Sequence, residues 1–241
     1  MRIVTNARLA GRLRKVAQYL FFVTFAIPLL GLFLINTQTD DVTLALILPS
    51  VVLLAALMIT MISVRLANLW IRQPHPEDVI GDSLRGIGKN AVLYHYFHFP
   101  ARHVLVAPQG VFAMVTRYQD GQFRVEGDKW SRFQRGGLAR IFSFLRFDSL
   151  GDPNRDARDA AAHVKRLLEP IAPDVEVHPL IVFVDPRVEV EMVDPAVPVV
   201  FPEASKLKPS LKDYIWSIGR GRYKTLTPEQ IEAFEAATVF G

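Results

Sequence analysis

The sequence predicts a mixed α/β or α+β domain that is preceded by a two-helix transmembrane hairpin. Residues 18–36 and 43–63 contain no charged side chain, and each segment approaches the roughly 20 residues that a helix needs to cross a ~30 Å hydrocarbon layer. After residue 78, strand-like runs are followed by a helix, another strand and two further helices. That order of elements is typical of a layered domain of strands and helices.

The distribution of basic residues predicts how the hairpin is oriented. Residues 37–42 are too few for anything but a tight reversal, so the two spans run antiparallel. Five basic residues precede the first span and two follow the second: Arg2, Arg8, Arg12, Arg14 and Lys15, then Arg65 and Arg72. By the positive-inside rule, we expect an integral membrane protein whose N-terminus and C-terminal domain are both cytoplasmic.

Two alternatives compete with the membrane hairpin. The first span could be a cleaved signal peptide, but no small-residue cleavage site follows it. The two spans could instead form a buried helical pair in a soluble core. That arrangement would need more apolar partner surface than the remaining chain offers.

The net charge of +4 reports membrane topology rather than affinity for nucleic acid. The seven basic residues that flank the spans, less Asp40 and Asp41 in the loop, carry +5, so the rest of the chain is at −1. The chain contains no cysteine. This fits a reducing cytoplasm and excludes disulfides, thiolate zinc sites and a cysteine nucleophile.

The composition along the chain divides it into five segments. We expect a basic cytoplasmic N-terminus, the hairpin, a juxtamembrane helix with a linker, a compact domain and a helical tail. Their bounds are 1–17, 18–63, 64–77, 78–205 and 206–241.

Within the domain, residues 78–89 have the mixed periodicity of a short helix. Alternating and β-branched patterns predict an antiparallel meander of strands at 91–99, 103–107, 111–118 and 122–125. A helix at 154–169, a buried strand at 175–184 and a short strand at 197–201 follow, and then helices at 209–218 and 228–237. Thr227, Pro228 and Gln230 predict a capping box at the start of the last helix.

Residues 78–205 resemble the nuclease-related domain (NERD) family. The matching residues are His103–Val106, Pro108–Phe112, Gly121, Trp130, Asp152-Pro153 before a helix, and Pro179–Val184. The resemblance implies a restriction-endonuclease-like sheet with flanking helices.

The resemblance also locates three catalytic positions, none of which keeps its residue. The family carries an aspartate just before the histidine and then Glu-x-Lys on the next strand, where carboxylates hold Mg²⁺ and the lysine orients or activates water. Here these positions are Arg102, Val115 and Arg117. An arginine repels a cation, and Arg117 cannot act as a base. The sequence therefore predicts no catalytic residues, no metal, no cofactor and no nuclease activity.

An active Mg²⁺-dependent phosphodiesterase is the alternative, with displaced acids as ligands. The nearest spare acids are Asp82, Asp120, Glu126 and Asp128, and their Gly-flanked positions favour turn and surface roles. His95, His98 and His103 also lie close in sequence. Strand alternation places His95 and His98 on opposite faces, which favours half-buried packing over a metal site.

A mixture of basic and aromatic residues suggests a binding surface. The candidates are Arg117, Arg124, Lys129, Trp130, Arg132, Arg135 and Arg140. Such a mixture can bind nucleic acid or anionic lipid headgroups, and residues 132–146 have the pattern of a basic interfacial helix or of a solvated loop or helix over the sheet. A protein partner and a purely structural membrane role also stay open.

Overall fold

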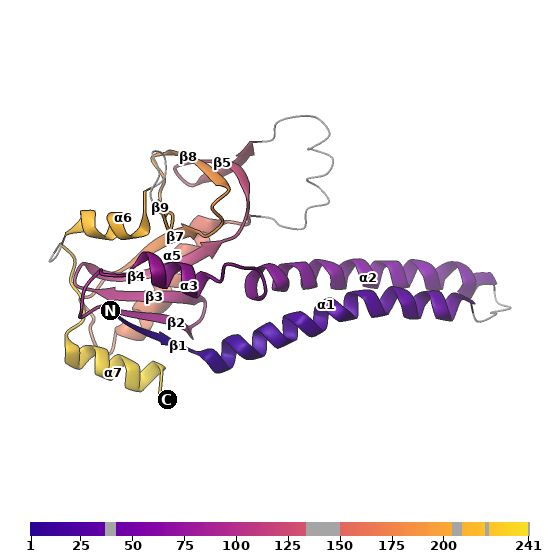
Figure 1. Cartoon of the computed structure of the whole chain (residues 1–241), viewed down its shortest axis with the longest axis horizontal. Coiled ribbons are helices and arrows are strands. Elements are labelled where there is room, and N and C mark those ends of the chain that lie inside the picture. Colours follow the sequence, from indigo (N-terminus) through magenta and orange to yellow (C-terminus); the bar gives the residue numbers. More distant parts are fainter. Residues whose placement is uncertain (37–41, 134–149, 204–208, 220–221, 241) are drawn as a thin grey trace. The chain divides into compact units, whose positions relative to one another are not determined.

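The computed structural model describes residues 1–36, 42–133, 150–203, 209–219 and 222–240. These residues form two compact units (Figure 1). One unit consists of Ala7–Gln73 and contains the helical hairpin. The other contains Met1–Asn6 together with the described residues from Pro74 onward, and it is called the globular unit below.

The hairpin consists of α1 (Ala7–Asn36) and α2 (Val42–Trp70), which pack against each other. Ala7–Phe33 and Ile47–Trp70 are long and apolar enough to cross a membrane, and only 11% and 6% of their most apolar windows are buried. A core helix of a soluble protein would be mostly buried, so this exposure argues against the buried-pair alternative. The predicted spans lie within these helices, although α1 begins eleven residues earlier than residue 18.

The main sheet of the globular unit has six strands in the order β1-β2-β3-β4-β7-β9. Their bounds are β1 Arg2–Thr5, β2 Val92–His98, β3 Ala101–Ala107, β4 Gly110–Arg117, β7 Val177–Phe183 and β9 Val199–Val200. The predicted antiparallel arrangement is confirmed for β2, β3 and β4. In contrast, β1, β7 and β9 each lie parallel to their neighbours, so the sheet is mixed.

Strand β1 was not expected, because residues 1–17 were predicted to be a basic segment outside the domain. Arg2–Thr5 pairs in register with Val92–His95 of β2, and the amide of Asn6 donates to the carbonyl of His95 over 3.0 Å. Four residues are too few to show a strand period, and their partner lies about ninety positions away. The chain therefore enters the sheet before it enters the hairpin.

The meander ends at β4, earlier than predicted. Strands β5 (Gly121–Glu126), β6 (Lys129–Phe133) and β8 (Val188–Val193) form a second sheet in the order β6-β5-β8. The predicted strand at 122–125 thus exists but belongs to another sheet, and β6 and β8 were not predicted. In β8, buried valines alternate with the exposed Glu189 and Glu191, so the strand is half-buried.

Four helices complete the globular unit: α3 (Pro76–Ser83), α5 (Pro153–Leu168), α6 (Leu211–Ile218) and α7 (Pro228–Thr238). Asp152 caps α5 by accepting a hydrogen bond from the amide of Arg155 at 3.0 Å. The predicted capping box of α7 is confirmed. The Thr227 hydroxyl accepts from the Gln230 amide, and the Gln230 side chain accepts from the Thr227 amide.

The main sheet is buried on both faces. Val104 of β3, Ala113 of β4 and Ile181 of β7 belong to one hydrophobic cluster with Ala157 and Ala160 of α5. Residues that alternate with these, such as Leu93, Leu105 and Phe112, are also fully buried on the opposite face. Tyr96 donates to Glu77 of α3 on that side over 2.6 Å. The unit is therefore a three-layer α/β/α structure.

Helix α7 is part of the globular unit and not a tail that follows it. Phe234 is fully buried in the main cluster, and Glu235 is 5% exposed. Arg2 of β1 donates to both carboxylate oxygens of Glu235, at 2.5 and 3.1 Å, and the Tyr94 hydroxyl donates at 2.8 Å. Burial raises the pKa of Tyr94, and the Glu235 carboxylate raises it further, so Tyr94 stays a donor.

We expect Arg2→Met to destabilise the globular unit by about 1–3 kcal/mol, because a buried carboxylate loses its cation while Tyr94 and water compensate in part. Thermal and chemical unfolding of the purified full chain, followed by circular dichroism, measures this. Arg85→Met is the matched control, since the Arg85–Asp82 pair is exposed. Equal stability of the Arg2 and Arg85 variants would contradict the prediction.

Candidate functional site

The three positions that the family resemblance marks come together on adjacent strands. Arg102 lies on β3, and Val115 and Arg117 lie on β4. The register pairs His103 with Met114, so Arg102 and Val115 are each one residue beyond that pair, toward the same end of the two strands. The chemistry that these positions allow therefore depends on the side chains that surround them.

Val115 faces the hydrophobic core. It is 8% exposed and belongs to the same cluster as Ala157, Ala160 and Ala161 of α5. A carboxylate in this place would need polar partners or a cation to compensate for the loss of water. Valine instead supports the packing of α5 on β4.

Arg117 forms an ion pair with an acid that the sequence analysis did not identify. One guanidinium nitrogen donates to the Asp156 carboxylate at 2.5 Å, and another donates to the Thr116 carbonyl at 3.2 Å. The Arg117 side chain is only 12% exposed. Asp156 lies in the first turn of α5, where the helix dipole also favours a negative charge. The place expected for lysine and metal chemistry therefore contains a fixed ion pair.

The four spare acids are paired with arginines as well. Each carboxylate lies 2.6–3.7 Å from a guanidinium nitrogen, and the pairs are Asp82–Arg85, Asp120–Arg187, Glu126–Arg124 and Asp128–Arg158. The hydrogen bond from Arg158, and then that from Asn154, lowers the pKa of Asp128. Within the described part of the chain, no three His, Cys, Asp or Glu side chains are grouped so that they could hold a metal ion.

The predicted basic and aromatic surface is divided among several environments. Trp130 packs on Phe183 and donates to Asn154 at 3.1 Å, so its ring is partly buried. Arg132 lies over the Phe123 ring and donates to the Asp120 carbonyl at 3.2 Å. Arg135, Arg140 and the rest of the predicted interfacial segment, 134–146, lie outside the described residues.

The outer face of the small sheet carries both charges. Arg124 lies opposite Glu191 of β8 in the register and pairs with both Glu191 and Glu126. Lys129 is exposed and lies opposite Glu126. Glu189 is the neighbouring acid on β8, where Gln122 donates to it at 2.7 Å. Three acids thus balance two cations on this face, which lowers its attraction for phosphate.

The three histidines of the β2–β3 hairpin are more deeply buried than the half-buried role that the sequence predicted. His95 and His103 are fully buried on one face, with their Nδ1 atoms 2.7 Å apart. His98 lies on the other face, as predicted, where its Nε2 is 2.9 Å from the Thr238 hydroxyl and its ring stacks on Phe234. Tyr96, which has a φ of 67°, lies in the register shift between His95 and His98.

Burial keeps these histidines neutral. It lowers the pKa of His95 to about 4, with Glu77 acting in the opposite direction, and lowers the pKa of His98 to about 4. The pKa of His103 lies well below its usual value because of burial, with smaller contributions from His95 and Arg102. With both rings neutral, one Nδ1 carries the proton and donates it in a hydrogen bond to the other Nδ1.

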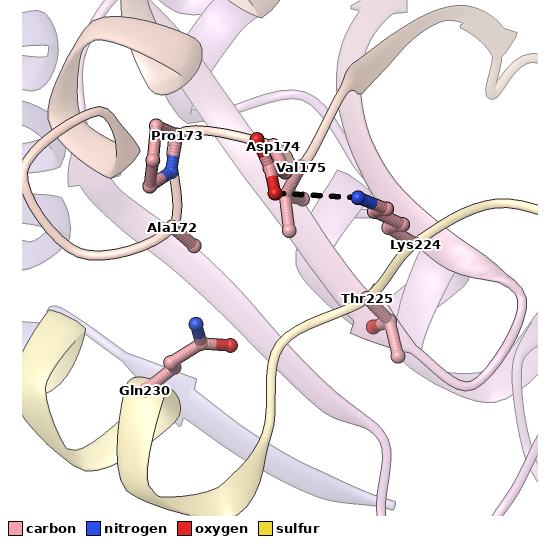
Figure 2. Close-up of a pocket in the computed structure, with 7 residues that line it drawn as sticks. All are labelled: Ala172, Pro173, Asp174, Val175, Lys224, Thr225 and Gln230. Atoms are coloured by element: carbon pink, nitrogen blue, oxygen red, sulfur yellow. Dashed lines mark hydrogen bonds and ion pairs between the residues drawn. The ribbon is translucent and has the colours of Figure 1, made fainter.

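One open hollow of about 330 Å³ lies between the turn after α5 and the segment before α7. Figure 2 shows Ala172, Pro173, Asp174 and Val175 on one side and Lys224, Thr225 and Gln230 on the other. Lys224 and Asp174 form an ion pair at 3.3 Å, and both side chains are largely exposed. The Thr225 hydroxyl and the Gln230 amide donate to backbone carbonyls. The four polar side chains named here therefore each have a partner within the protein.

Comparisons of the chain with models of known protein families, with curated proteins and with solved structures find no match.

We expect the globular unit to lose stability as the pH falls below about 6.5. The folded pKa values of His95, His98 and His103 are depressed, so the unfolded chain binds more protons between pH 6.5 and 4. Each histidine should then cost about 1.4 kcal/mol per pH unit in this window. Denaturant unfolding of the full chain at pH 7.5 and 5.5 measures the difference. Replacing His95 and His103 with leucine should reduce the slope, and an unchanged stability at pH 5.5 would contradict the prediction.

Proposed function

We propose that this chain is a membrane-anchored domain similar to the nuclease-related domain family, that it does not catalyse phosphodiester cleavage, and that it acts as a binding module. One observation carries the non-catalytic part. Where the family has Glu-x-Lys, Val115 lies in the hydrophobic core and Arg117 is held by Asp156.

The element order supports a restriction-endonuclease-like arrangement. Helix α3 precedes three antiparallel strands, β2, β3 and β4, and α5 then leads to β7, which lies parallel to β4. Asp152 and Pro153, two of the residues that carry the resemblance, form the cap and first turn of α5. Leu180–Val184, from another matching segment, is buried, and Leu180–Phe183 lies in β7 between β4 and β9.

Membrane anchoring rests on α1 and α2. Both helices are long enough to span a bilayer and expose large apolar side chains along most of their length, among them Phe22, Phe25, Leu29, Leu53 and Leu54. Exposure of so large a continuous apolar surface to water is unfavourable. The two helices therefore support membrane association.

The pairing of β1 supports a topology in which both ends of the hairpin emerge on the same side. Met1–Asn6 belongs to the same compact unit as the residues after Pro74, and the hairpin lies between them in sequence. Arg2 and Glu235 can pair only if the N-terminus and the C-terminal helix share one compartment. The Arg2–Glu235 pair is independent of the positive-inside rule, which adds that the compartment is the cytoplasm.

The charges of the small sheet favour a protein partner over nucleic acid. Arg124 and Lys129 are accompanied by Glu126, Glu189 and Glu191 on the same outer face. A nucleic-acid surface needs cations that are not neutralised by neighbouring carboxylates, because binding releases counterions from phosphates. A face of both charges suits the polar surface of a protein.

We expect the purified chain to leave plasmid and linear DNA intact in Mg²⁺ or Mn²⁺, because the acids among the described residues are not grouped to hold the ion. Agarose gels with and without chelator measure this. Cleavage that is lost on chelation, and lost again in an Asp120→Asn/Asp156→Asn variant, would overturn the non-catalytic proposal. Cleavage that persists in this variant but separates from the chain on further purification comes from a contaminant and does not count against the proposal.

We expect residue 5 and residue 131 to be labelled from the same side of the membrane and residue 39 from the other. The chain has no cysteine, so Thr5→Cys, Ser131→Cys and Thr39→Cys each introduce one thiol. An impermeant maleimide should label only Thr39→Cys on intact cells and all three after permeabilisation, with Thr5→Cys slowed by its place in β1. Labelling of Thr5→Cys but not Ser131→Cys on intact cells would contradict the shared compartment.

A further inference from the structure

One side of α1 carries small residues that are buried. Ala10 and Ala17 are buried, and Gly31 is buried two further heptads along the same line. A Cβ atom on Gly31 would lie 2.4 Å from a methyl group of Val52, so the two backbones approach closely at this point. Because an α-helix turns about 100° per residue, these three residues define one side of α1.

The opposite side of α1 carries a line of cations. Arg8, Arg12 and Lys15 are exposed within the hairpin unit and are spaced by four and three residues. That spacing places them within an arc of about 60°, roughly 180° from the line of Ala10 and Ala17. Tyr19, which is 70% exposed, continues the line by one more turn. We call Arg8, Arg12 and Lys15 the cationic stripe.

The cationic stripe lies at the depth of lipid headgroups. The uncharged part of α1 begins at Gln18, and about 20 residues from there fill the hydrocarbon layer. At about 1.5 Å per residue, Lys15 lies about 5 Å and Arg8 about 15 Å before that boundary. Tyr19 sits at the boundary, where aromatic residues with a polar end are enriched.

No carboxylate along the hairpin helices compensates these charges. Residues 7–36 and 42–70 contain no aspartate or glutamate. Arg65 of α2, which is exposed, adds positive charge near the same end of the antiparallel hairpin. Long basic side chains at this depth reach along the apolar surface and place their charge among the headgroups.

From this arrangement we propose that the cationic stripe binds the phosphate groups of anionic phospholipids in the leaflet next to the N-terminal end of α1. The inference rests on the membrane anchoring proposed above and goes beyond it by naming a lipid class and the residues that select it. The stripe is a row of cations on helices that contain no carboxylate, whereas the face of the small sheet carries both charges.

The test compares lipid retention by the full chain in detergent micelles, measured by native mass spectrometry with equal amounts of phosphatidylglycerol and phosphatidylcholine. The wild-type chain should retain phosphatidylglycerol in clear preference. A cation near an anionic membrane surface is worth about 1 kcal/mol, which is about a fivefold change in affinity. The Arg8→Gln/Arg12→Gln/Lys15→Gln variant should therefore lose the preference by at least tenfold.

Two further variants separate lipid selection from general effects of charge or folding. Arg85→Gln/Lys129→Gln/Arg155→Gln removes three exposed cations from the globular unit and should keep the preference. Arg8→Lys/Arg12→Lys/Lys15→Arg keeps the charges and should keep it too. An unchanged preference in the glutamine variant, or equal retention of the two lipids by the wild-type chain, would overturn the inference.

Membrane insertion is measured separately, by carbonate extraction of membranes that contain each variant. A chain that is extracted as a soluble protein would sink the anchoring proposal and the lipid inference together. A chain that stays inserted but shows no lipid preference would sink the lipid inference alone.

Discussion

Glu235 is a buried carboxylate that joins the two ends of the chain. Its charge is compensated by Arg2 of the first strand, and the Tyr94 hydroxyl from the neighbouring strand accounts for a further hydrogen bond. A buried carboxylate without such partners would be strongly destabilising. The positions of α7, β1 and β2 therefore depend on one another. The hairpin between β1 and the rest of the domain is, in structural terms, an insertion into the globular unit.

An insertion of this kind explains why β2 is so deeply buried. With β1 on one side and β3 on the other, β2 is an interior strand, and six of its seven residues are buried. Without β1 it would be an edge strand whose unpaired amides invite association with other chains. The first six residues thus cover an edge that a domain starting at residue 78 would leave open. They also connect the first helix of the hairpin to β2, which is the strand that the chain reaches through α3 after the second helix.

The elements that could be predicted from the sequence are those whose structure is determined by local chemistry. The capping box of Thr227 and Gln230, the helix after Asp152-Pro153 and the antiparallel strands on either side of Pro108-Gln109-Gly110 all depend on residues within a few positions of one another. The missed elements depend on distant partners. Arg2–Thr5 is a strand because Val92–His95 lies beside it, and Val188–Val193 is a strand because Gly121–Glu126 does.

The candidate site follows the same division. Arg102, Val115 and Arg117 could be located from the strand pattern, and the structure places them on adjacent strands. Asp156, the partner of Arg117, could not, since it is one of several charged residues on the polar side of α5 and only the packing of α5 on β4 selects it. The acids on β8 that balance Arg124 were missed for the same reason. A surface inferred from one stretch of sequence therefore overestimates its charge when a distant strand supplies the opposite sign.

In the proposed similarity to the nuclease-related domain family, the Arg117–Asp156 pair lies where the family has a lysine near its metal ion. In the proposed comparison, a divalent ion and a lysine would bring positive charge to this end of β4, and acids nearby would need that charge. Arg117 carries a permanent positive charge, because a guanidinium is essentially never deprotonated. It forms an ion pair with Asp156 at the start of α5. The charges of Arg117 and Asp156 neutralise each other, and both side chains are always present, whereas an exchangeable ion can leave. Restoring the family's glutamate at position 115 would therefore place a carboxylate among the alanines of α5, whereas a lysine at position 117 would keep a positive charge beside Asp156.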